Sequence, residues 1–341
     1  MKIHITKNDL TNKLKSKYFI VILSSEENLQ KCINNNIAGF PKTDNGRWAY
    51  LDINKGDYIS FYYNGRIFNL YQVNKKFIPD EFKKKEMGNE EYDPVALSDN
   101  KKERWRAIIT KKGNIYFPYR LSLSLEAKTE FNTSLIFKNG FERFGINLVP
   151  RVSLKKSHFQ LSVNDIEKIF NRNVSPNQYE FTWMDFKEVT EIRSDSKSIV
   201  SIADITTKEI FLQSLLKRIL ESSVDKYSKI FHLNSGEGYI EFFSEQTVYG
   251  GEADIVIANY YENLAFIEVK NGTILNKKGK LTRLGEEACK QVKSYKDIIN
   301  PKKKIKKFIA GKGSMKDNII LKIIKEDDIY VIEINSEFNI A

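Results

Sequence analysis

The chain has 341 residues, of which 41% are hydrophobic, so it can bury cores and is not an intrinsically disordered chain. This length exceeds what one typical core accommodates, and we expect two domains. The 55 lysine and arginine residues outnumber the 44 acidic residues and leave a net charge of +11. Such a surplus suits a polyanionic partner, although a lysine-rich composition by itself is an unspecific signal.

The cysteine content and the hydropathy pattern exclude several protein classes. Cys32 and Cys289 are far apart and form no CxxC pair, so we expect neither a zinc ribbon nor an iron–sulfur cluster. Two cysteines in a chain of this size fit a reducing compartment. The N-terminus lacks the apolar segment of a signal peptide, and no apolar run approaches the length of a membrane span. We therefore expect a cytoplasmic protein that makes no membrane contact.

The first part of the chain is rich in strand and turn signals. Residues 18–23 (YFIVIL) are wholly apolar and predict a buried strand. Ser24 and Ser25 then indicate a helix over residues 26–34. A Lys-Gly-Asp turn follows at residues 55–57, and Asn-Gly at residues 64–65 separates two aromatic-rich runs. This pattern predicts a β-hairpin.

The middle of the chain alternates between loops and short elements. Residues 75–102 are polar and predict a surface excursion. Strand-like segments return at 104–109 and 115–125, and residues 161–170 predict a short helix capped by Ser162 or Asn164. We expect the first domain to span residues 1–172 and a connector to span residues 173–203.

The last part, residues 204–341, has an α/β pattern. A helix capped by Thr206 or Thr207 carries apolar residues at three- and four-residue spacing. The expected elements after it are three strand-like runs (GYIEFF, EADIVIA and LAFIEVK), a helix over 285–299, a strand over 306–310, a helix over 314–325 and a strand over 329–334. This order predicts an α/β domain.

Two of these strand-like runs carry a polar constellation. Asp254 begins one apolar run, and Glu268 and Lys270 end the next. Strand alternation places Glu268 and Lys270 on one face and Val269 on the other. Two carboxylates beside an amine can hold a hard divalent cation near a phosphodiester and activate a water molecule. An isolated Glu-Val-Lys is common on surface strands, so the preceding Asp254 is what makes the pattern informative.

Residues 206–334 resemble the PD-(D/E)XK nuclease superfamily, whose core is a helix, a three-stranded meander, a helix and a strand. Asp254 falls on the motif aspartate, with Ala253 in the place of the usual proline, and Glu268-Val269-Lys270 falls on the (D/E)XK part. The resemblance implies that a glutamate on the first helix completes the metal site with Asp254 and Glu268. Glu209 matches that place best, and Glu221 is the alternative.

A second resemblance within this part is to RecB-like nucleases. Gln291 and Tyr295 stand at i, i+4, as in their QxxxY element, which implies that both lie near the catalytic site and contact nucleic acid. Lysines and an arginine follow the Glu-Val-Lys run, and we expect Lys277, Lys278 and Arg283 to contact phosphates. A solvated basic face is the alternative for any single lysine.

The N-terminal part resembles the PUA-like superfamily, particularly its EVE and YTH branches. The shared features are the opening buried strand, the Ser-Ser-Glu-Glu-Asn helix start, the Lys-Gly-Asp turn and the aromatic hairpin. The resemblance implies a mainly-β barrel that holds a modified base in an aromatic pocket. The expected pocket residues are Phe40, Trp48, Tyr62 and Trp105. For each of these aromatic residues, a place in the core is the alternative.

The nuclease resemblance of residues 206–334 and the PUA-like resemblance of the N-terminal part together imply a metal-dependent DNA endonuclease, a restriction enzyme that recognises a modified base with its N-terminal domain. Oxygen ligands favour Mg²⁺, with Mn²⁺ as the alternative cofactor. The expected partner is double-stranded DNA, and a homodimer would supply two sites for cutting both strands. The alternatives are a structure-specific DNA repair or recombination nuclease and a non-catalytic nucleic-acid-binding protein, and RNA remains an open partner.

Overall fold

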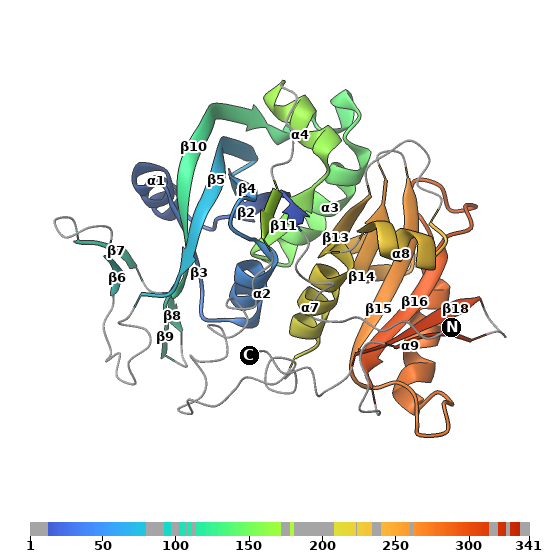
Figure 1. Ribbon diagram of the computed structural model, residues 1–341. Coiled ribbons are helices and arrows are strands. Elements are labelled where there is room, and N and C mark those ends of the chain that lie inside the picture. Colours follow the sequence, from blue (N-terminus) through green and yellow to red (C-terminus); the bar gives the residue numbers. More distant parts are fainter. Residues whose placement is uncertain are drawn as a thin grey trace. The chain divides into compact units, whose positions relative to one another are not determined.

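A computed structural model describes residues 13–79, 92–96, 102–106, 108–110, 113–171, 178–180, 208–222, 224–233, 240–259, 262–313, 320–324 and 328–334. The protein is of the mixed α/β class and divides into a first unit around Lys15–Tyr179 and a second unit around Lys197–Ala341. Figure 1 shows a curled sheet in each unit. Lys13 and Leu14 group with the second unit, whereas the expected first domain included them.

The first unit contains the following elements in chain order: β2 (Tyr18–Ile22), α1 (Glu26–Asn35), β3 (Ile37–Phe40), α2 (Asp44–Asp52), β4 (Tyr58–Tyr63), β5 (Arg66–Phe77), β6 (Tyr92–Ala96), β7 (Lys102–Arg106), β8 (Ile108–Thr110), β9 (Gly113–Ile115), β10 (Tyr119–Asn132), η3 (Thr133–Leu135), η4 (Phe137–Asn139), α3 (Glu142–Ser153), β11 (His158–Leu161) and α4 (Val163–Phe170). β1 (Lys13–Lys15) and β12 (Gln178–Glu180) pair with each other.

Six strands of the first unit form one mixed sheet in the order β11-β2-β4-β5-β10-β3. β2 and β4 are parallel and the other neighbours are antiparallel. The long β10 pairs with both β5 and β3, and register shifts along its pairing with β5 bend it. The expected mainly-β barrel is therefore wrong in one respect. Among the described residues the sheet is not closed, because β11 and β3 are its two edges, and four α-helices pack around it.

Local sequence signals account for several boundaries in this unit. Ser25 caps α1 by accepting a hydrogen bond from the backbone N–H of Asn28, and Ser162 caps α4 in the same way through Asp165. Asn64 and Gly65 adopt positive φ angles of 45° and 78° between β4 and β5. This is the turn conformation that matches the twist of a hairpin, so the Asn-Gly prediction is confirmed.

One hydrophobic cluster joins the sheet to the last two helices of the first unit. It contains Ile20 of β2, Phe144 of α3 and Ile166 of α4, each at most 2% exposed. The sequence patterns predicted α4 but neither α2 nor α3. α3 has no side-chain cap, whereas Thr43 caps α2 and was overlooked beside the preceding Pro41.

The second unit contains, in chain order, α7 (Glu209–Ser222), α8 (Val224–Ile230), β13 (Glu241–Val248), β14 (Gly251–Ala258), β15 (Asn263–Thr273), α9 (Arg283–Ser294), β16 (Lys306–Lys312), β17 (Ile320–Ile324) and β18 (Ile329–Ile334). Its sheet has the order β13-β14-β15-β16-β18-β17. β13, β14 and β15 form an antiparallel meander, and β16 and β18 continue the sheet in parallel with β15.

The order of helix, three strands, helix and strand agrees with the sequence-based expectation, with two corrections. The expected helix over 314–325 is wrong for residues 320–324, which form β17 and pair with β18; the rest of that prediction from 314 to 319 lies outside the described residues. This segment is rich in isoleucine, whose branched side chain favours a strand that has a partner. The other correction is that α9 ends at Ser294, with Tyr295 as its C-cap.

Helices cover both faces of the second sheet. Phe308 of β16 packs against Phe231, which follows α8, with ring centroids 4.6 Å apart. The next residue, Ile309, belongs to the cluster that contains Ala288 and Val292 of α9. Because successive strand residues point to opposite faces, α8 and α9 lie on opposite sides of the sheet, as Figure 1 shows.

Candidate functional site

Glu268 and Lys270 meet at the end of β15. Val269 between them is fully buried, so the two polar side chains share the opposite face, as strand alternation predicts. The Lys270 Nζ donates a hydrogen bond to Glu268 Oε1 over 2.5 Å. Glu268 is 1% exposed and the Lys270 side chain 15% exposed, so the pair lies beneath the surface.

Asp254 reaches the same place from the neighbouring strand. The last paired residues of β14 and β15 are Ile255 and Ile267, so the next residue, Asp254, lies where the two strands separate. Its Oδ2 accepts a hydrogen bond from the backbone N–H of Val269 over 2.6 Å. The Asp254 carboxylate thus replaces a missing ladder bond, and its Oδ1 accepts no hydrogen bond from any described residue.

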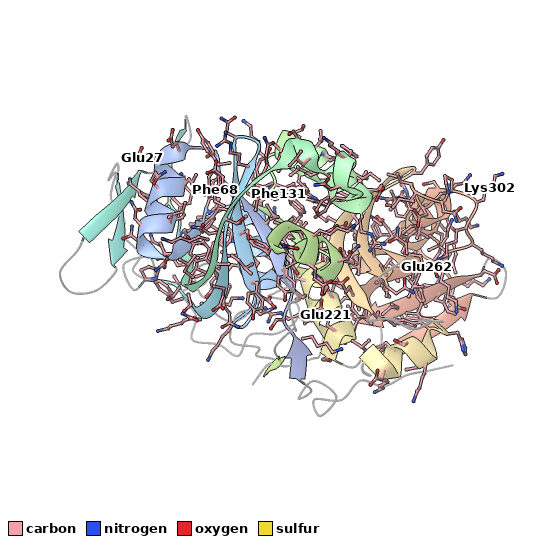
Figure 2. The ribbon with its side chains drawn as sticks, turned by 90° about the horizontal axis from the view of Figure 1, so that it is seen from above. Glu27, Phe68, Phe131, Glu221, Glu262 and Lys302 are labelled. Carbon is pink, nitrogen blue, oxygen red and sulfur yellow. The ribbon has the colours of Figure 1, made fainter. Side chains whose placement is uncertain are left out.

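Glu209, the first residue of α7, completes the group. Its Oε1 lies 3.5 Å from the Lys270 Nζ, and its Oε2 accepts a hydrogen bond from the backbone N–H of Asn271 over 3.3 Å. Glu221 stands twelve residues further along the same helix, about 18 Å away at 1.5 Å per residue, and is labelled in Figure 2. Of the two candidates from the sequence, the structure brings only Glu209 to the group.

Tyr295 holds the second oxygen of Glu268. Its hydroxyl lies 2.6 Å from Glu268 Oε2 and 2.9 Å from the carbonyl oxygen of Glu252. The Gln291 amide donates to the same hydroxyl over 2.8 Å, so the tyrosine proton is directed toward the two acceptors. Tyr295 is 1% exposed. The ring is therefore not available for the direct contact with nucleic acid that the resemblance implies. Tyr295 acts on the site through Glu268.

The shared charge shifts the protonation equilibria of this group. Burial raises the pKa of Asp254 well above its ordinary value, and the negative charge of Glu268 raises it further. Burial also raises the pKa of Glu268, although the hydrogen bonds from Lys270 and Tyr295 oppose the shift. Burial alone would lower the pKa of Lys270, but the hydrogen bond and the charge of Glu268 outweigh it and raise that pKa. The lysine is therefore held as an ammonium.

These residues offer the ligand chemistry of a hard divalent cation. Asp254, Glu268 and Glu209 supply carboxylate oxygens, and the free Oδ1 of Asp254 could bind a cation without losing a hydrogen bond. Among the described residues, no three acidic, histidine or cysteine side chains already form a metal cluster. The Lys270 ammonium occupies the space between Glu268 and Glu209. The donor set fits Mg²⁺, provided that this ammonium moves when the cation binds.

The predicted phosphate-binding residues lie on the connection that leaves β15. Lys277 and Lys278 are exposed in a turn that Asn276 orders through backbone hydrogen bonds. Arg283 is 92% exposed and pairs with Glu287, four residues along α9. Lys302, on the loop before β16, also projects outward (Figure 2). Lys277 and Lys278 form no ion pair with a described residue and lie close in sequence to the carboxylate group, whereas Glu287 partly neutralises the charge of Arg283.

The aromatic residues predicted to hold a base do not form an open pocket. Phe40 and Trp48 are each 1% exposed, and Trp48 packs edge-on against His158 with centroids 4.4 Å apart. A base cannot stack on rings that are covered in this way. Tyr62 is partly buried and packs against the core cluster, and the side chain of Trp105 lies outside the described residues. Tertiary packing thus makes Phe40 and Trp48 core residues.

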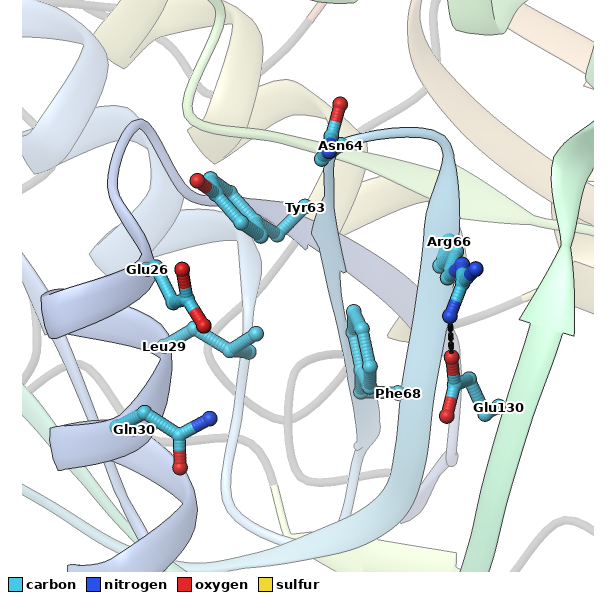
Figure 3. Close-up of a pocket in the computed structure, with 8 residues that line it drawn as sticks. All are labelled: Glu26, Leu29, Gln30, Tyr63, Asn64, Arg66, Phe68 and Glu130. Carbon is cyan, nitrogen blue, oxygen red and sulfur yellow. Dashed lines mark hydrogen bonds and ion pairs between the residues drawn. The ribbon is translucent and has the colours of Figure 1, made fainter.

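The first unit instead has a pocket that the sequence analysis missed, between α1 and the β4–β5 hairpin (Figure 3). Its volume is about 450 Å³, within the usual range for small-molecule sites. Glu26 and Leu29 of α1 face Tyr63 and Phe68 of the hairpin across it. Glu26 forms no ion pair with a described residue. The available signal was the pair of aromatic residues on either side of the Asn-Gly turn.

Comparisons with known proteins found little. No family model and no curated protein matches the chain. One similar solved structure is the YTH domain of the Zygosaccharomyces rouxii MRB1 protein in complex with N6-methyladenosine RNA, at 13% sequence identity. The match covers 59% of this chain and 95% of that chain with a TM-score of 0.21, which is too low to carry an argument. No helix among the described residues has both the length and the apolar character that crossing a bilayer requires.

Proposed function

We propose that the protein is a metal-dependent DNA endonuclease whose second unit hydrolyses phosphodiester bonds and whose first unit recognises a modified base. One observation carries the catalytic part of the proposal. Asp254, Glu268, Glu209 and the ammonium of Lys270 converge from two strands and a helix. This combination of hard oxygen donors and one lysine ammonium suits phosphodiester hydrolysis.

Each residue of the group has a distinct role in this proposal. A bound Mg²⁺ supplies Lewis acidity and lowers the pKa of a water molecule. Asp254 and Glu268, on adjacent strands, would hold the cation together with Glu209, whose side chain is 43% exposed. The Lys270 ammonium, if it leaves Glu268, would orient the attacking water and stabilise the charge that develops on the phosphate. Tyr295 keeps Glu268 in position.

Cleavage of modified and unmodified duplexes tests the proposal. The wild-type protein with Mg²⁺ should cut a duplex that carries its modified base, and chelation of the metal should abolish cutting. Asp254→Asn, Glu268→Gln and Lys270→Ala should each lower the rate by at least about 100-fold, since each removes a charge used in the transition state. Glu262→Gln is the matched control, because Glu262 pairs with Lys303 away from the group and should leave the rate unchanged.

A wild-type protein that cuts neither duplex nor single-stranded DNA, with any metal or base modification, would overturn the catalytic proposal. Retained activity in a folded Asp254→Asn or Glu268→Gln protein would overturn the assignment of the site. Circular dichroism of each variant separates loss of activity from loss of fold.

For base recognition we assign the pocket between α1 and the β4–β5 hairpin, since the other aromatic candidates with described side chains are buried or packed on the core. Tyr63 and Phe68 offer ring surfaces, and the Glu26 carboxylate, which forms no ion pair with a described residue, can accept a hydrogen bond from an amino group on the edge of a base. Phe68→Leu should weaken binding to modified DNA more than to unmodified DNA, and the exposed Phe137→Leu should change neither affinity. Equal affinity of the wild type for both DNAs would contradict base recognition.

A further inference from the structure

Tyr249 is an exposed aromatic residue held in a rigid setting. It lies in the turn between β13 and β14 and is 62% exposed. Its backbone N–H donates to the carbonyl of Lys296 over 2.9 Å, and its carbonyl accepts from the N–H of Lys296 over 3.1 Å. The next residue, Gly250, has a φ of 96°, and a Cβ atom there would lie 2.7 Å from the carbonyl oxygen of Ser294. The turn is thus fixed to the end of α9.

Positive charge lies near this ring. The Lys296 ammonium lies 5.9 Å from the centroid of the Tyr249 ring. The Lys307 ammonium donates to the carbonyl of Lys293 over 2.5 Å. Burial lowers the pKa of Lys307, and the positive charges of Lys296 and Lys293 lower it further, so Lys307 lies within the field of both. In the part of the chain that the structure describes, neither Lys296 nor Lys307 pairs with a carboxylate.

The same turn is directly connected to the carboxylate group. Tyr295, the residue before Lys296, holds Glu268 through its hydroxyl. β14 begins two residues after Tyr249 and carries Asp254 five residues after it. At about 3.4 Å per residue, the backbone at Tyr249 lies at most about 17 Å from that at Asp254. This separation corresponds to a few nucleotides of a strand that passes through the proposed site.

The chemistry of this surface selects a particular form of nucleic acid. A fixed aromatic ring beside unpaired ammonium groups can stack a base while the ammonium groups contact the adjoining phosphates. Inside a duplex, both faces of each base are covered by neighbouring base pairs. A base that stacks on Tyr249 must therefore come from an unpaired segment or a frayed end.

We propose that Tyr249, Lys296 and Lys307 form a binding surface for an unpaired stretch of the nucleic-acid strand that enters the carboxylate group. The inference rests on the proposed nuclease function and narrows its substrate class to DNA with single-stranded character. The DNA that we expect at the active site is an unpaired segment rather than a continuous duplex. This favours the structure-specific nuclease among the alternatives.

Binding in EDTA tests this inference without cleavage. We would measure fluorescence anisotropy of the full-length protein with a labelled single strand, a blunt duplex and a duplex with an overhang. Tyr249→Leu should weaken binding of the single strand and the overhang about tenfold, in line with the loss of one stacked base, and should change duplex binding by less than about twofold. Tyr249→Phe should retain the wild-type affinity because it keeps the ring.

Matched variants separate stacking from charge and from surface hydrophobicity. Phe137→Leu removes an equally exposed ring, 68% exposed, from the first unit and should have no effect on single-strand binding. Lys296→Ala should reduce the slope of log affinity against log salt by about 1, and Lys296→Arg should restore it.

Three results would overturn the inference: unchanged single-strand affinity in Tyr249→Leu, an equal loss on the blunt duplex, or no binding of a single strand by the wild type. None of these depends on cleavage. A protein that cuts DNA with Mg²⁺ but tolerates Tyr249→Leu would refute only the binding surface. A protein that binds single strands through Tyr249 but never cuts them would refute only the nuclease.

Discussion

Glu268 is a buried carboxylate with both oxygens occupied, one by the Lys270 ammonium and one by the Tyr295 hydroxyl. Its neighbour Asp254 uses one oxygen to accept a backbone hydrogen bond, and the other accepts none from a described residue. Two carboxylates this close destabilise each other when both are ionised, and only one ammonium compensates them. The group therefore carries excess negative charge, which a divalent cation would neutralise.

This excess charge predicts a stabilising substitution. The pKa of Asp254 is raised in the folded protein, so protonation of this carboxyl favours the folded state. The stability that it contributes is fully present below the unfolded pKa and is lost as pH rises through the folded pKa. Asp254→Asn keeps the acceptor for Val269 and removes the charge. Without metal and at neutral pH, the free energy of unfolding of this variant should exceed that of wild type by on the order of 1 kcal/mol per unit of pKa shift, so it should melt at a higher temperature. In acid the two proteins should melt at the same temperature.

Thermal melts from acid to neutral pH, in EDTA and in Mg²⁺, check this prediction. Mg²⁺ should raise the melting temperature of the wild type and not that of Asp254→Asn, because ligand binding stabilises only a site that can bind. A variant less stable than wild type at neutral pH would show that the Asp254 charge is already compensated.

Removal of the Tyr295 hydroxyl should lower activity and have little effect on the fold. Tyr295→Phe keeps the ring that packs near Phe266 and removes only the hydroxyl that holds Glu268. Because supporting partners of metal ligands typically contribute 10–100-fold, the cleavage rate or the Mg²⁺ affinity should fall by about that factor. Steady-state kinetics over a Mg²⁺ series measure both quantities. A purely structural role would lower the melting temperature and leave the Mg²⁺ dependence unchanged.

At the scale of the elements, local sequence decided where many helices and strands begin and end. Serine caps set the starts of α1 and α4, and the Asn-Gly turn set the β4–β5 hairpin. These signals act within a few residues, which is why the sequence reveals them. β17 shows the opposite case, since it is a strand because β18 pairs with it, and that partner is not visible in a local pattern.

The turn before β4 predicts a stability effect. The carboxylate of Asp57 is fully buried and accepts hydrogen bonds from the backbone N–H groups of Asn54 and Lys17, over 2.7 and 2.8 Å. It ties the turn to the segment that enters β2. Asp57→Ala leaves two donors unsatisfied and should cost about 3 kcal/mol. Urea denaturation measures this, with the exposed Lys55→Ala as the control; a loss below about 1 kcal/mol would contradict the assigned role.

At the scale of the whole molecule, the division into two units has a consequence for unfolding. Each unit has its own six-stranded sheet and its own hydrophobic cluster. Units with separate cores can lose structure separately, so a single all-or-none transition is not expected.

Calorimetry should therefore resolve two transitions. Asp57→Ala should lower only the transition of the first unit, and Asp254→Asn should shift only that of the second, because each residue makes its contacts inside one unit. A single transition that both substitutions shift equally would show that the units unfold together.

The sequence by itself determined the alternation that puts Glu268 and Lys270 on one face, the strand that brings Asp254 beside them, the capped helices and the Asn-Gly hairpin. All of these depend on backbone geometry within a few residues. Only the tertiary structure decided that Glu209 rather than Glu221 joins the group and that Tyr295 holds Glu268 from the interior. It also decided that Phe40 and Trp48 are core residues. Those outcomes depend on contacts between segments distant in the chain, and neither spacing nor composition encodes which side chains such contacts will bury.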